Sequence, residues 1–285
     1  MSQKTRSTVE SPKIACVQMV SGTGVAPNLT AAAQGIQSAV EQGADVVVLP
    51  EYFCIMGQNE FDKLGVAEDF NPDPRLNAQP IQHFLRQQAI EHGIYLIAGT
   101  IPLKSSSPDK VYNTTLVYSP SGEIEARYDK IHLFGFNNGT ESYAEADAIM
   151  AGAADNVCVW DSPWGRIGIS ICYDLRFPEL FRQAGDVLAW VLTAAFTHTT
   201  GQAHWEVLLR ARAIENQCYV VACGQGGWHE NGRRTFGHSM IIDAWGVVQA
   251  VREEGEGVVL GTLSSGRNDR VRSSLPALQH RVLAC

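Results

Sequence analysis

The sequence lacks long apolar runs, paired cysteine motifs and clusters of basic residues. None of its apolar runs reaches the roughly 18 residues that cross a membrane, so we predict no membrane span. The seven cysteines form no Cys-x-x-Cys pair, which excludes zinc-finger spacing and favours a reducing, cytoplasmic compartment. Acidic residues outnumber basic ones by 30 to 22, and Arg233-Arg234 is the only adjacent basic pair. This balance argues against nucleic acid as a partner.

The sequence also lacks an internal linker, a low-complexity tract and a signal peptide. Residues 1–12 are polar and contain no apolar core of the kind that a signal peptide needs, so we predict a short disordered leader. The remaining residues, 13–285, are read as one domain. With 45% hydrophobic and 18% charged residues, their composition is that of a globular protein with a sizeable core.

Short apolar runs alternate along the chain with amphipathic stretches. The residues of 80–93 and 201–217 have helical periodicity, whereas runs such as "ADVVVLPE" and "VLAWVLTAAF" are typical of buried strands. Several strand-like runs are joined by short turns, which favours antiparallel pairs beside parallel ones. We therefore predict a mixed α/β fold and not a purely parallel sheet.

The stretch "GISICYDLRFPE", residues 168–179, places one cysteine where an apolar run turns polar. A cysteine at the end of such a run is most often a buried core residue. Cys172, however, lies at the carboxyl end of a predicted strand, where α/β proteins collect their ligands. Because a free thiol is mostly protonated at neutral pH, a nucleophilic Cys172 needs a base or a cation nearby.

Two other strand ends supply such groups. Glu51 ends "VVVLPE" and could accept a proton if it is partly buried, while Lys130 in "YDKIHLF" could stabilise a developing oxyanion. Taken alone, each is more typical of a solvated surface residue. His132 lies two residues after Lys130 and would point to the same side of an extended strand, so a Cys-His pair stays open as an alternative.

Three segments in this order, "LPEYF", "YDKIHLF" and "GISICYDLRFPELFR", resemble the nitrilase superfamily of carbon-nitrogen hydrolases. The later segments "AHWEVLLRARAIENQCYVVAC", "FGHSMIIDAWG" and "LPALQHR" are similar to that family too. The resemblance extends over residues 13–281. It implies an α/β fold built as a four-layer α-β-β-α sandwich, with two mixed sheets flanked by helices.

The resemblance also implies a catalytic triad. In it, Glu51 is the general base, Lys130 stabilises the tetrahedral intermediate and Cys172 is the nucleophile. The backbone N–H of Tyr173 would complete the oxyanion hole, and Glu141 in "GTESY" matches a second, supporting glutamate. No metal and no cofactor is implied.

Residues 135–143 depart from the more common family pattern "HLFDVDIPG", which leaves the substrate less defined than the chemistry. The motif "CYD" is similar to that of aliphatic amidases, and the helical run after it resembles the branch that acts on deaminated glutathione. We therefore expect hydrolysis of the terminal carboxamide of a small carboxylate-bearing substrate, through a thioester, to acid and ammonia. An ω-amidase acting on α-ketoglutaramate, a nitrilase and an N-carbamoyl amidohydrolase are the alternatives.

Four residues are candidates for binding the substrate. Arg176 resembles the position that holds a substrate carboxylate, and a guanidinium suits that role because it can donate two parallel hydrogen bonds. A structural ion pair with Asp174 or Glu179 would explain Arg176 equally well. The segment "AAFTHTTG" after a buried strand is expected to line the pocket with Phe196, Thr197 and Thr199.

In the family, the helix that corresponds to 201–217 lies at a subunit contact, so a homodimer or larger homo-oligomer is expected. Two rival classes use the same residues differently. A redox-sensing protein would use Cys172 as a reactive thiol, although no second cysteine lies close in sequence to resolve it. A catalytically inactive scaffold would keep the fold, and the presence of all three triad residues argues against it.

Overall fold

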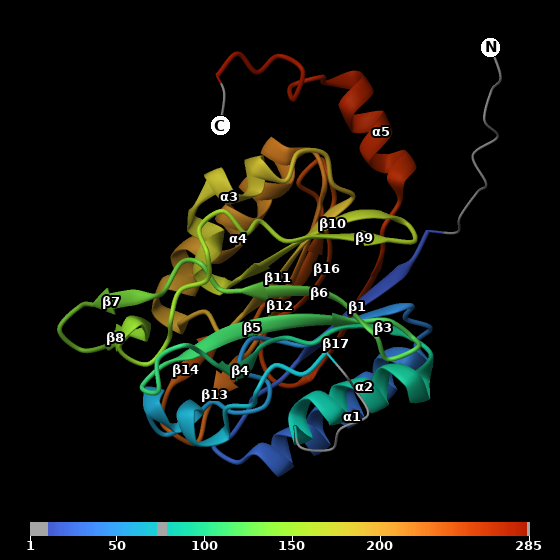
Figure 1. The fold of residues 1–285 in the computed structure, drawn as a ribbon. Coiled ribbons are helices and arrows are strands. Elements are labelled where there is room, and N and C mark those ends of the chain that lie inside the picture. The colour runs from blue at the N-terminus through green and yellow to red at the C-terminus, as the bar shows by residue number, and fades with distance from the viewer. Residues whose placement is uncertain (1–10, 73–78, 284–285) are drawn as a thin grey trace.

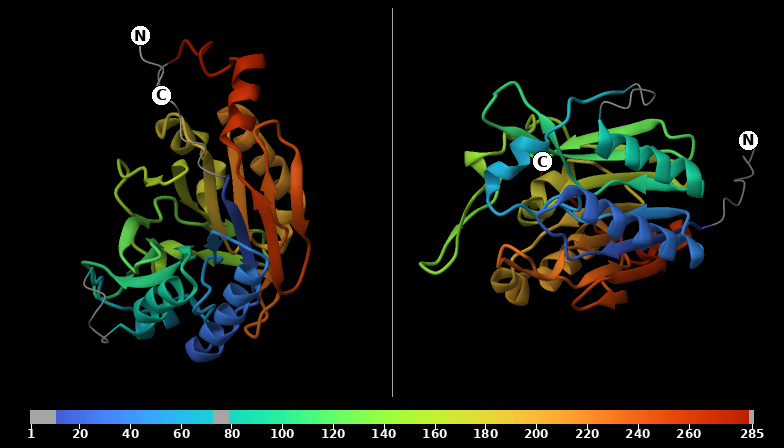
Figure 2. Two further views of the ribbon diagram at one scale, coloured as in Figure 1. Left: turned by 90° about the vertical axis from the view of Figure 1, so that its right-hand side faces the viewer. Right: turned by 90° about the horizontal axis from the view of Figure 1, so that it is seen from below.

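The structure is a computed structural model that describes residues 11–72 and 79–283. Most of the predicted disordered leader, residues 1–10, lies outside the described residues. The predicted α/β fold is confirmed: two mixed sheets pack face to face, with helices outside them (Figures 1 and 2). In the described part of the chain, no helix has the length and apolar character needed to cross a membrane.

The first sheet has the order β17-β1-β2-β3-β5-β4, with β6 also paired to β5. Its three neighbours β1, β2 and β3 are parallel, and the other pairs are antiparallel. The strands of this sheet are β1 (Lys13–Gln18), β2 (Val46–Val48), β3 (Tyr95–Ile97), β4 (Ile101–Lys104), β5 (Val111–Tyr118), β6 (Ile124–Asp129) and β17 (Gly257–Thr262).

The second sheet has the order β16-β15-β12-β11-β10-β9, in which β10, β11 and β12 are parallel. Its strands are β9 (Val159–Ser162), β10 (Gly165–Ile171), β11 (Ala189–Ala194), β12 (Tyr219–Gly224), β15 (Ser239–Ile242) and β16 (Val248–Arg252). Two separate hairpins complete the strands: β7 (Gly135–Asn137) with β8 (Ser142–Ala144), and β13 (Gly226–Trp228) with β14 (Arg234–Phe236).

Helices cover the outer faces of both sheets, which gives the four layers (Figures 1 and 2). On the first sheet lie α1 (Val25–Glu41) and α2 (Pro80–His92), and on the second lie α3 (Pro178–Gln183) and α4 (His198–Asn216), while α5 (Ser265–Ser274) follows β17. The predicted helices 80–93 and 201–217 are thus confirmed as α2 and α4. Gly93 ends α2 with φ of 63°, a left-handed conformation that glycine adopts without strain.

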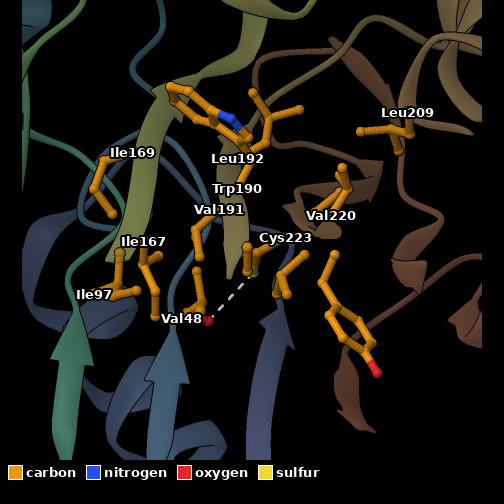
Figure 3. Close-up of a cluster of buried hydrophobic side chains, with 14 of the residues drawn as sticks. Val48, Ile97, Ile167, Ile169, Trp190, Val191, Leu192, Leu209, Val220 and Cys223 are labelled. Carbon is orange, nitrogen blue, oxygen red and sulfur yellow. Dashed lines mark hydrogen bonds between the residues drawn. The ribbon is translucent and has the colours of Figure 1, made fainter. Parts of the chain in front are cut away.

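The main core lies between the sheets (Figure 3). The central strands are rich in β-branched residues because both of their faces are buried. Val48 of β2 and Ile97 of β3 face Ile169 of β10 and Val191 of β11, and all four are fully buried or nearly so. The Cys223 thiol of β12 donates a hydrogen bond to the Val48 carbonyl oxygen at 3.3 Å, which ties the two sheets together. This core fixes the relative position of the strand ends that carry the site.

Candidate active site

Cys172 lies immediately after β10, as the first residue of the short 3₁₀ helix Cys172–Arg176. Its φ is 48°, which is unfavourable for a residue with a side chain, and only 7% of it is exposed. Strained backbone of this kind persists where the surrounding structure enforces it, and it concentrates at active sites. The turn presents the thiol in a cavity at the end of the strand.

Glu51 follows β2, on the opposite sheet, and its side chain extends to the Cys172 thiol. One of its oxygens accepts hydrogen bonds from Lys130 Nζ and Asn113 Nδ2, both at 2.9 Å. The other accepts from the backbone N–H of Ala195 at 2.8 Å. With 1% of Glu51 exposed, these three donors hold its carboxylate in a single orientation, as expected for an acceptor-only group.

Lys130 follows β6 and is fully buried. Its ammonium group donates to Glu51 at 2.9 Å and to both oxygens of Glu145, at 2.9 and 2.7 Å. Glu145 also accepts from the Tyr52 hydroxyl and the Phe134 backbone N–H, each at 2.7 Å. Lys130 therefore lies between two buried carboxylates, and each carboxylate is held by further donors.

The charges of these groups follow from their surroundings. Burial would lower the pKa of Lys130, but the carboxylates of Glu145 and Glu51 outweigh burial and raise it. Burial would raise the pKa of Glu145, and attraction to Lys130 lowers it instead. Burial raises the pKa of the Cys172 thiol, and the neighbouring Glu51 raises it further. At neutral pH, Lys130 and Glu145 are therefore charged, while Cys172 is a neutral thiol.

His132 does not pair with Cys172, so the Cys-His alternative is wrong. Its Nδ1 lies 2.7 Å from the Asp174 carboxylate, and its ring stacks on Phe177 with centroids 3.7 Å apart. Asp174 also accepts from the Tyr128 hydroxyl and the Ile171 backbone N–H, both at 2.8 Å. These contacts anchor the turn that carries Cys172.

Cys172 opens into a small inner cavity of about 10 Å³. The wall of this inner cavity consists of Phe134, Glu145, Cys172, Tyr173, Ala195, Phe196, Thr197, Thr200 and Arg233. Three predicted residues besides Cys172 are thus placed at the cavity: Tyr173, Phe196 and Thr197. The prediction for Thr199 is wrong, because its side chain is exposed and Thr200 lines the cavity one residue later.

A larger outer groove of about 590 Å³ lies next to the inner cavity. It is lined by Met56–Glu60, by Thr140–Tyr143 of the β7–β8 hairpin, and by Trp228 and Asn231–Arg234 around the β13–β14 turn. Figure 1 shows these two hairpins at the same side of the molecule. The unusual loop 135–143 therefore forms a hairpin that borders this groove.

Glu141 was expected as the supporting glutamate, and this expectation is wrong. Its carboxylate accepts hydrogen bonds from the hydroxyls of Thr199, at 2.6 Å, and Tyr143, at 3.3 Å. It lies on the exposed hairpin, and Glu145 takes the place beside Lys130. The β7–β8 hairpin extends away from the site, and Glu145, the first residue after β8, lies beside the buried Lys130.

Arg176 lies behind two residues of the cavity wall, without lining the cavity itself. Its guanidinium lies over the rings of Phe196, at 5.2 Å, and Tyr173, at 5.7 Å. Its Nη1 lies 3.3 Å from His204 Nδ1, and in residues 11–72 and 79–283 it forms no ion pair. An ion pair of Arg176 with Asp174 or with Glu179 is therefore absent from this part of the chain.

Sequence analysis missed several residues of the site, among them Asn113, Glu145 and Arg233. Asn113 was visible as a lone amide in the strand "VYNTTLVY", and Arg233 belongs to the one adjacent basic pair. Glu145 lies four residues after Glu141, and no local pattern distinguishes the two acids. The difference arises from the hairpin between them, which is a tertiary feature.

Comparison with known proteins agrees with this geometry. The family model described as carbon-nitrogen hydrolase matches residues 13–273. A deaminated glutathione amidase from Synechocystis sp. is 42% identical over 274 residues, which cover 94% of this chain and 97% of the relative. The deaminated glutathione amidase of Homo sapiens is 35% identical over 281 residues, which cover 96% of this chain and 84% of the relative.

Two solved structures share the fold. The Caenorhabditis elegans NitFhit protein is 36% identical with a TM-score of 0.85, over 95% of this chain and 65% of that one. Saccharomyces cerevisiae Nit3, described as a member of the nitrilase superfamily, is 29% identical with a TM-score of 0.85, over 96% and 97% of the two chains. The chain described here therefore belongs to the carbon-nitrogen hydrolase family, within the nitrilase superfamily.

Proposed function

We propose that this protein is a cysteine-dependent amidase in which Cys172 is the nucleophile, Glu51 the general base and Lys130 the cation that stabilises the oxyanion. The observation that carries the proposal is that three strand ends, from both sheets, bring Glu51 and Lys130 together at 2.9 Å next to the buried Cys172 thiol. A neutral thiol beside a fixed carboxylate and a charged lysine is the arrangement that acyl transfer needs.

In the proposed reaction, Cys172 Sγ attacks the amide carbonyl carbon while Glu51 takes the thiol proton. Lys130 and the Tyr173 backbone N–H bind the oxyanion that forms. Protonated Glu51 then gives its proton to the amide nitrogen, the C–N bond breaks and a thioester to Cys172 remains. Water, deprotonated by Glu51, attacks the thioester and releases the acid, which restores the thiol. Glu145 keeps Lys130 charged and in place throughout.

We propose deaminated glutathione as the substrate, supported by the relatives that carry its name. In this compound an amide joins a 2-oxoglutaryl group to cysteinylglycine. The leaving group is therefore a dipeptide amine, whereas the terminal carboxamide expected from the sequence would release ammonia. α-Ketoglutaramate has the same acyl group with ammonia as the leaving group, so the two amides differ only on the nitrogen side.

The test is a substrate panel with the purified protein. It contains deaminated glutathione, α-ketoglutaramate, an aliphatic nitrile and an N-carbamoyl amino acid, and it measures 2-oxoglutarate, ammonia and remaining substrate. We expect the highest kcat/KM for deaminated glutathione. Turnover of the nitrile or the carbamoyl compound alone would overturn the substrate proposal. Oxidation of Cys172 to a reversible disulfide without any hydrolysis would favour the redox-thiol alternative.

We propose Arg176 as the partner of the 2-oxoglutaryl carboxylate, which reaches its guanidinium only when the rings of Phe196 and Tyr173 move aside. Because the guanidinium can bind a carboxylate bidentately, we expect Arg176→Ala to raise KM about 10- to 100-fold for carboxylate-bearing amides. Neutral amides of similar size should change by no more than about 2-fold. Steady-state kinetics on matched acid and neutral amide pairs provides the measurement. An equal effect on both classes would make Arg176 a structural residue.

We also propose that the protein is cytoplasmic and forms a homodimer through α4. The support is an exposed apolar patch of four residues, which we call the α4 patch: Val207, Ile214, Trp245 and Val247, each 48–68% exposed. Arg210 of α4 donates a hydrogen bond to the Gly246 carbonyl at 3.0 Å, which joins α4 to the turn before β16. Exposed apolar patches of this kind mark interaction sites.

Sedimentation velocity tests the homodimer. We expect the wild-type protein to sediment as a dimer or a larger oligomer, and Trp245→Glu, which buries a charge in the interface, to shift it toward the monomer. Lys104→Glu, an exposed change on the other sheet, is the control and should leave the oligomer intact. A wild-type monomer at all concentrations would contradict the proposal.

A further inference from the structure

Arg233 lies at the junction between the inner cavity and the outer groove. Among the described residues, it is the only one that lines both of them. Any ligand group that extends from the thiol of Cys172 into the outer groove must therefore pass its guanidinium. Arg233 takes no part in the proposed bond-breaking steps.

The guanidinium of Arg233 is held in place but is not fully paired. Its side chain is 12% exposed, and it lies 5.0 Å from the Tyr143 ring centroid. Its Nη2 donates to the Ala195 carbonyl oxygen at 3.1 Å, whereas the Glu60 carboxylate lies 4.0 Å from Nη1. Its Nε is buried and has no hydrogen-bond partner in the described part of the chain. Nη1 also contacts the Met56 sulfur at 3.9 Å, so the nearest carboxylate is the distant Glu60 and much of the positive charge is left for a bound anion.

The other charged groups of the outer groove have closer partners. Arg234 forms an ion pair with Glu254 at 2.6 Å, and Glu60 pairs with Lys63. Glu141 accepts the Thr199 hydroxyl at 2.6 Å. Arg234 Nε is likewise buried without a partner in the described residues, but the carboxylate nearest to Arg234 is at 2.6 Å and the one nearest to Arg233 is at 4.0 Å. Arg233 is thus the arginine of this groove whose charge is less neutralised by a carboxylate.

The sizes of the two spaces decide which part of a substrate Arg233 meets. The inner cavity of about 10 Å³ has room for about one water molecule, which is too little for any part of a substrate beyond the scissile group. A dipeptide leaving group is many times larger and fits only the outer groove of about 590 Å³. To reach that groove from the scissile nitrogen, the dipeptide must run past Arg233.

We propose that Arg233 determines specificity by binding the carboxylate of an extended, peptide-like leaving group, which selects such amides over simple carboxamides. This inference rests on the proposed amidase function and deepens it. A substrate with a carboxylate at each end would then have an arginine for each: Arg176 for the acyl end and Arg233 for the amine end. Arg233 recognises substrate and takes no part in bond breaking.

The test compares three amides with the same 2-oxoglutaryl group. They are deaminated glutathione, its C-terminal glycinamide analogue, and α-ketoglutaramate. In Arg233→Met we expect KM for deaminated glutathione to rise about 10- to 100-fold, the effect of one charge-assisted hydrogen-bonded pair. The glycinamide analogue and α-ketoglutaramate should change by less than about 3-fold, with kcat retained for all three. Arg233→Lys should recover part of the affinity for deaminated glutathione alone.

A positioning role would give a different result. Arg233 contacts the Ala195 carbonyl, and the Ala195 N–H holds Glu51, so a merely structural Arg233 would lower kcat equally for all three amides. That outcome, or no effect on any of them, would overturn the proposal. Arg166→Met, an exposed arginine on the far part of β10, is the matched control, and the melting temperature of each variant is compared with wild type.

Failure of the proposed function is distinguishable from failure of this inference. Hydrolysis of α-ketoglutaramate without hydrolysis of deaminated glutathione would overturn the role of Arg233 and leave the amidase chemistry standing. If no amide is hydrolysed, calorimetry decides: deaminated glutathione is titrated into Cys172→Ala with and without Arg233→Met. A Kd that is unchanged by Arg233→Met would overturn the inference, and a 10- to 100-fold weaker Kd would support it.

Discussion

Replacing Cys172 with alanine should lower amide turnover by at least about 10⁴-fold, since loss of a nucleophile leaves only binding and oxyanion stabilisation. The fold should survive, because the change removes a single sulfur atom beside a cavity that is already present. Cys172→Ser is the more informative variant. It keeps a hydroxyl at the same place, but an alkoxide is far harder to form than a thiolate, so we expect almost equally low turnover.

Cys158→Ala provides the matched control. Cys158 is buried in the second sheet's core and lies outside the inner cavity, so its loss should cost stability and leave kcat within about 2-fold. Rapid quenching followed by mass spectrometry should find the 2-oxoglutaryl group attached to Cys172 in the wild-type protein. Wild-type turnover in Cys172→Ala would remove this residue from the mechanism.

Replacing Glu145 with glutamine should have the second largest effect. Glu145 accepts four hydrogen bonds from three groups, Lys130 Nζ, the Tyr52 hydroxyl and the Phe134 backbone N–H, and an amide nitrogen would point a further donor at one of them. Removing one partner of a buried ion pair costs about 3–5 kcal/mol. We therefore expect a fall of about 3 kcal/mol in the free energy of unfolding and a 10²- to 10³-fold lower kcat, with KM changed much less.

Urea denaturation and steady-state kinetics with α-ketoglutaramate measure these two effects. The control is Glu141→Gln, the glutamate that the sequence favoured. It should keep its stability within about 0.5 kcal/mol, because Glu141 is not buried and its partners are an exposed and a half-buried hydroxyl. Its kcat should change no more than about 3-fold. If Glu141→Gln lowered kcat as much as Glu145→Gln, the assignment of the supporting glutamate made from the structure would be wrong.

The local sequence was sufficient for much of the fold. Apolar runs such as "ADVVVLPE" and the helical periods of 80–93 and 201–217 depend on neighbours within one turn or one strand, so the pattern alone reveals them. The same holds for Glu51, Lys130 and Cys172, which all follow strand-like runs. Their motifs, in order, indicated a common family and hence a common cavity, which no single motif could do.

By itself, then, the sequence determined the α/β class, the family and the three residues that we propose for catalysis. Only the tertiary structure decided which neighbours surround them. It placed Glu145, and not Glu141, beside Lys130, and Thr200, and not Thr199, at the cavity. It also paired His132 with Asp174 and not with Cys172. The physical reason is that these choices depend on the β7–β8 hairpin and on two sheets meeting at their strand ends. Such contacts join residues far apart in the chain, and spacing along the sequence carries no record of them.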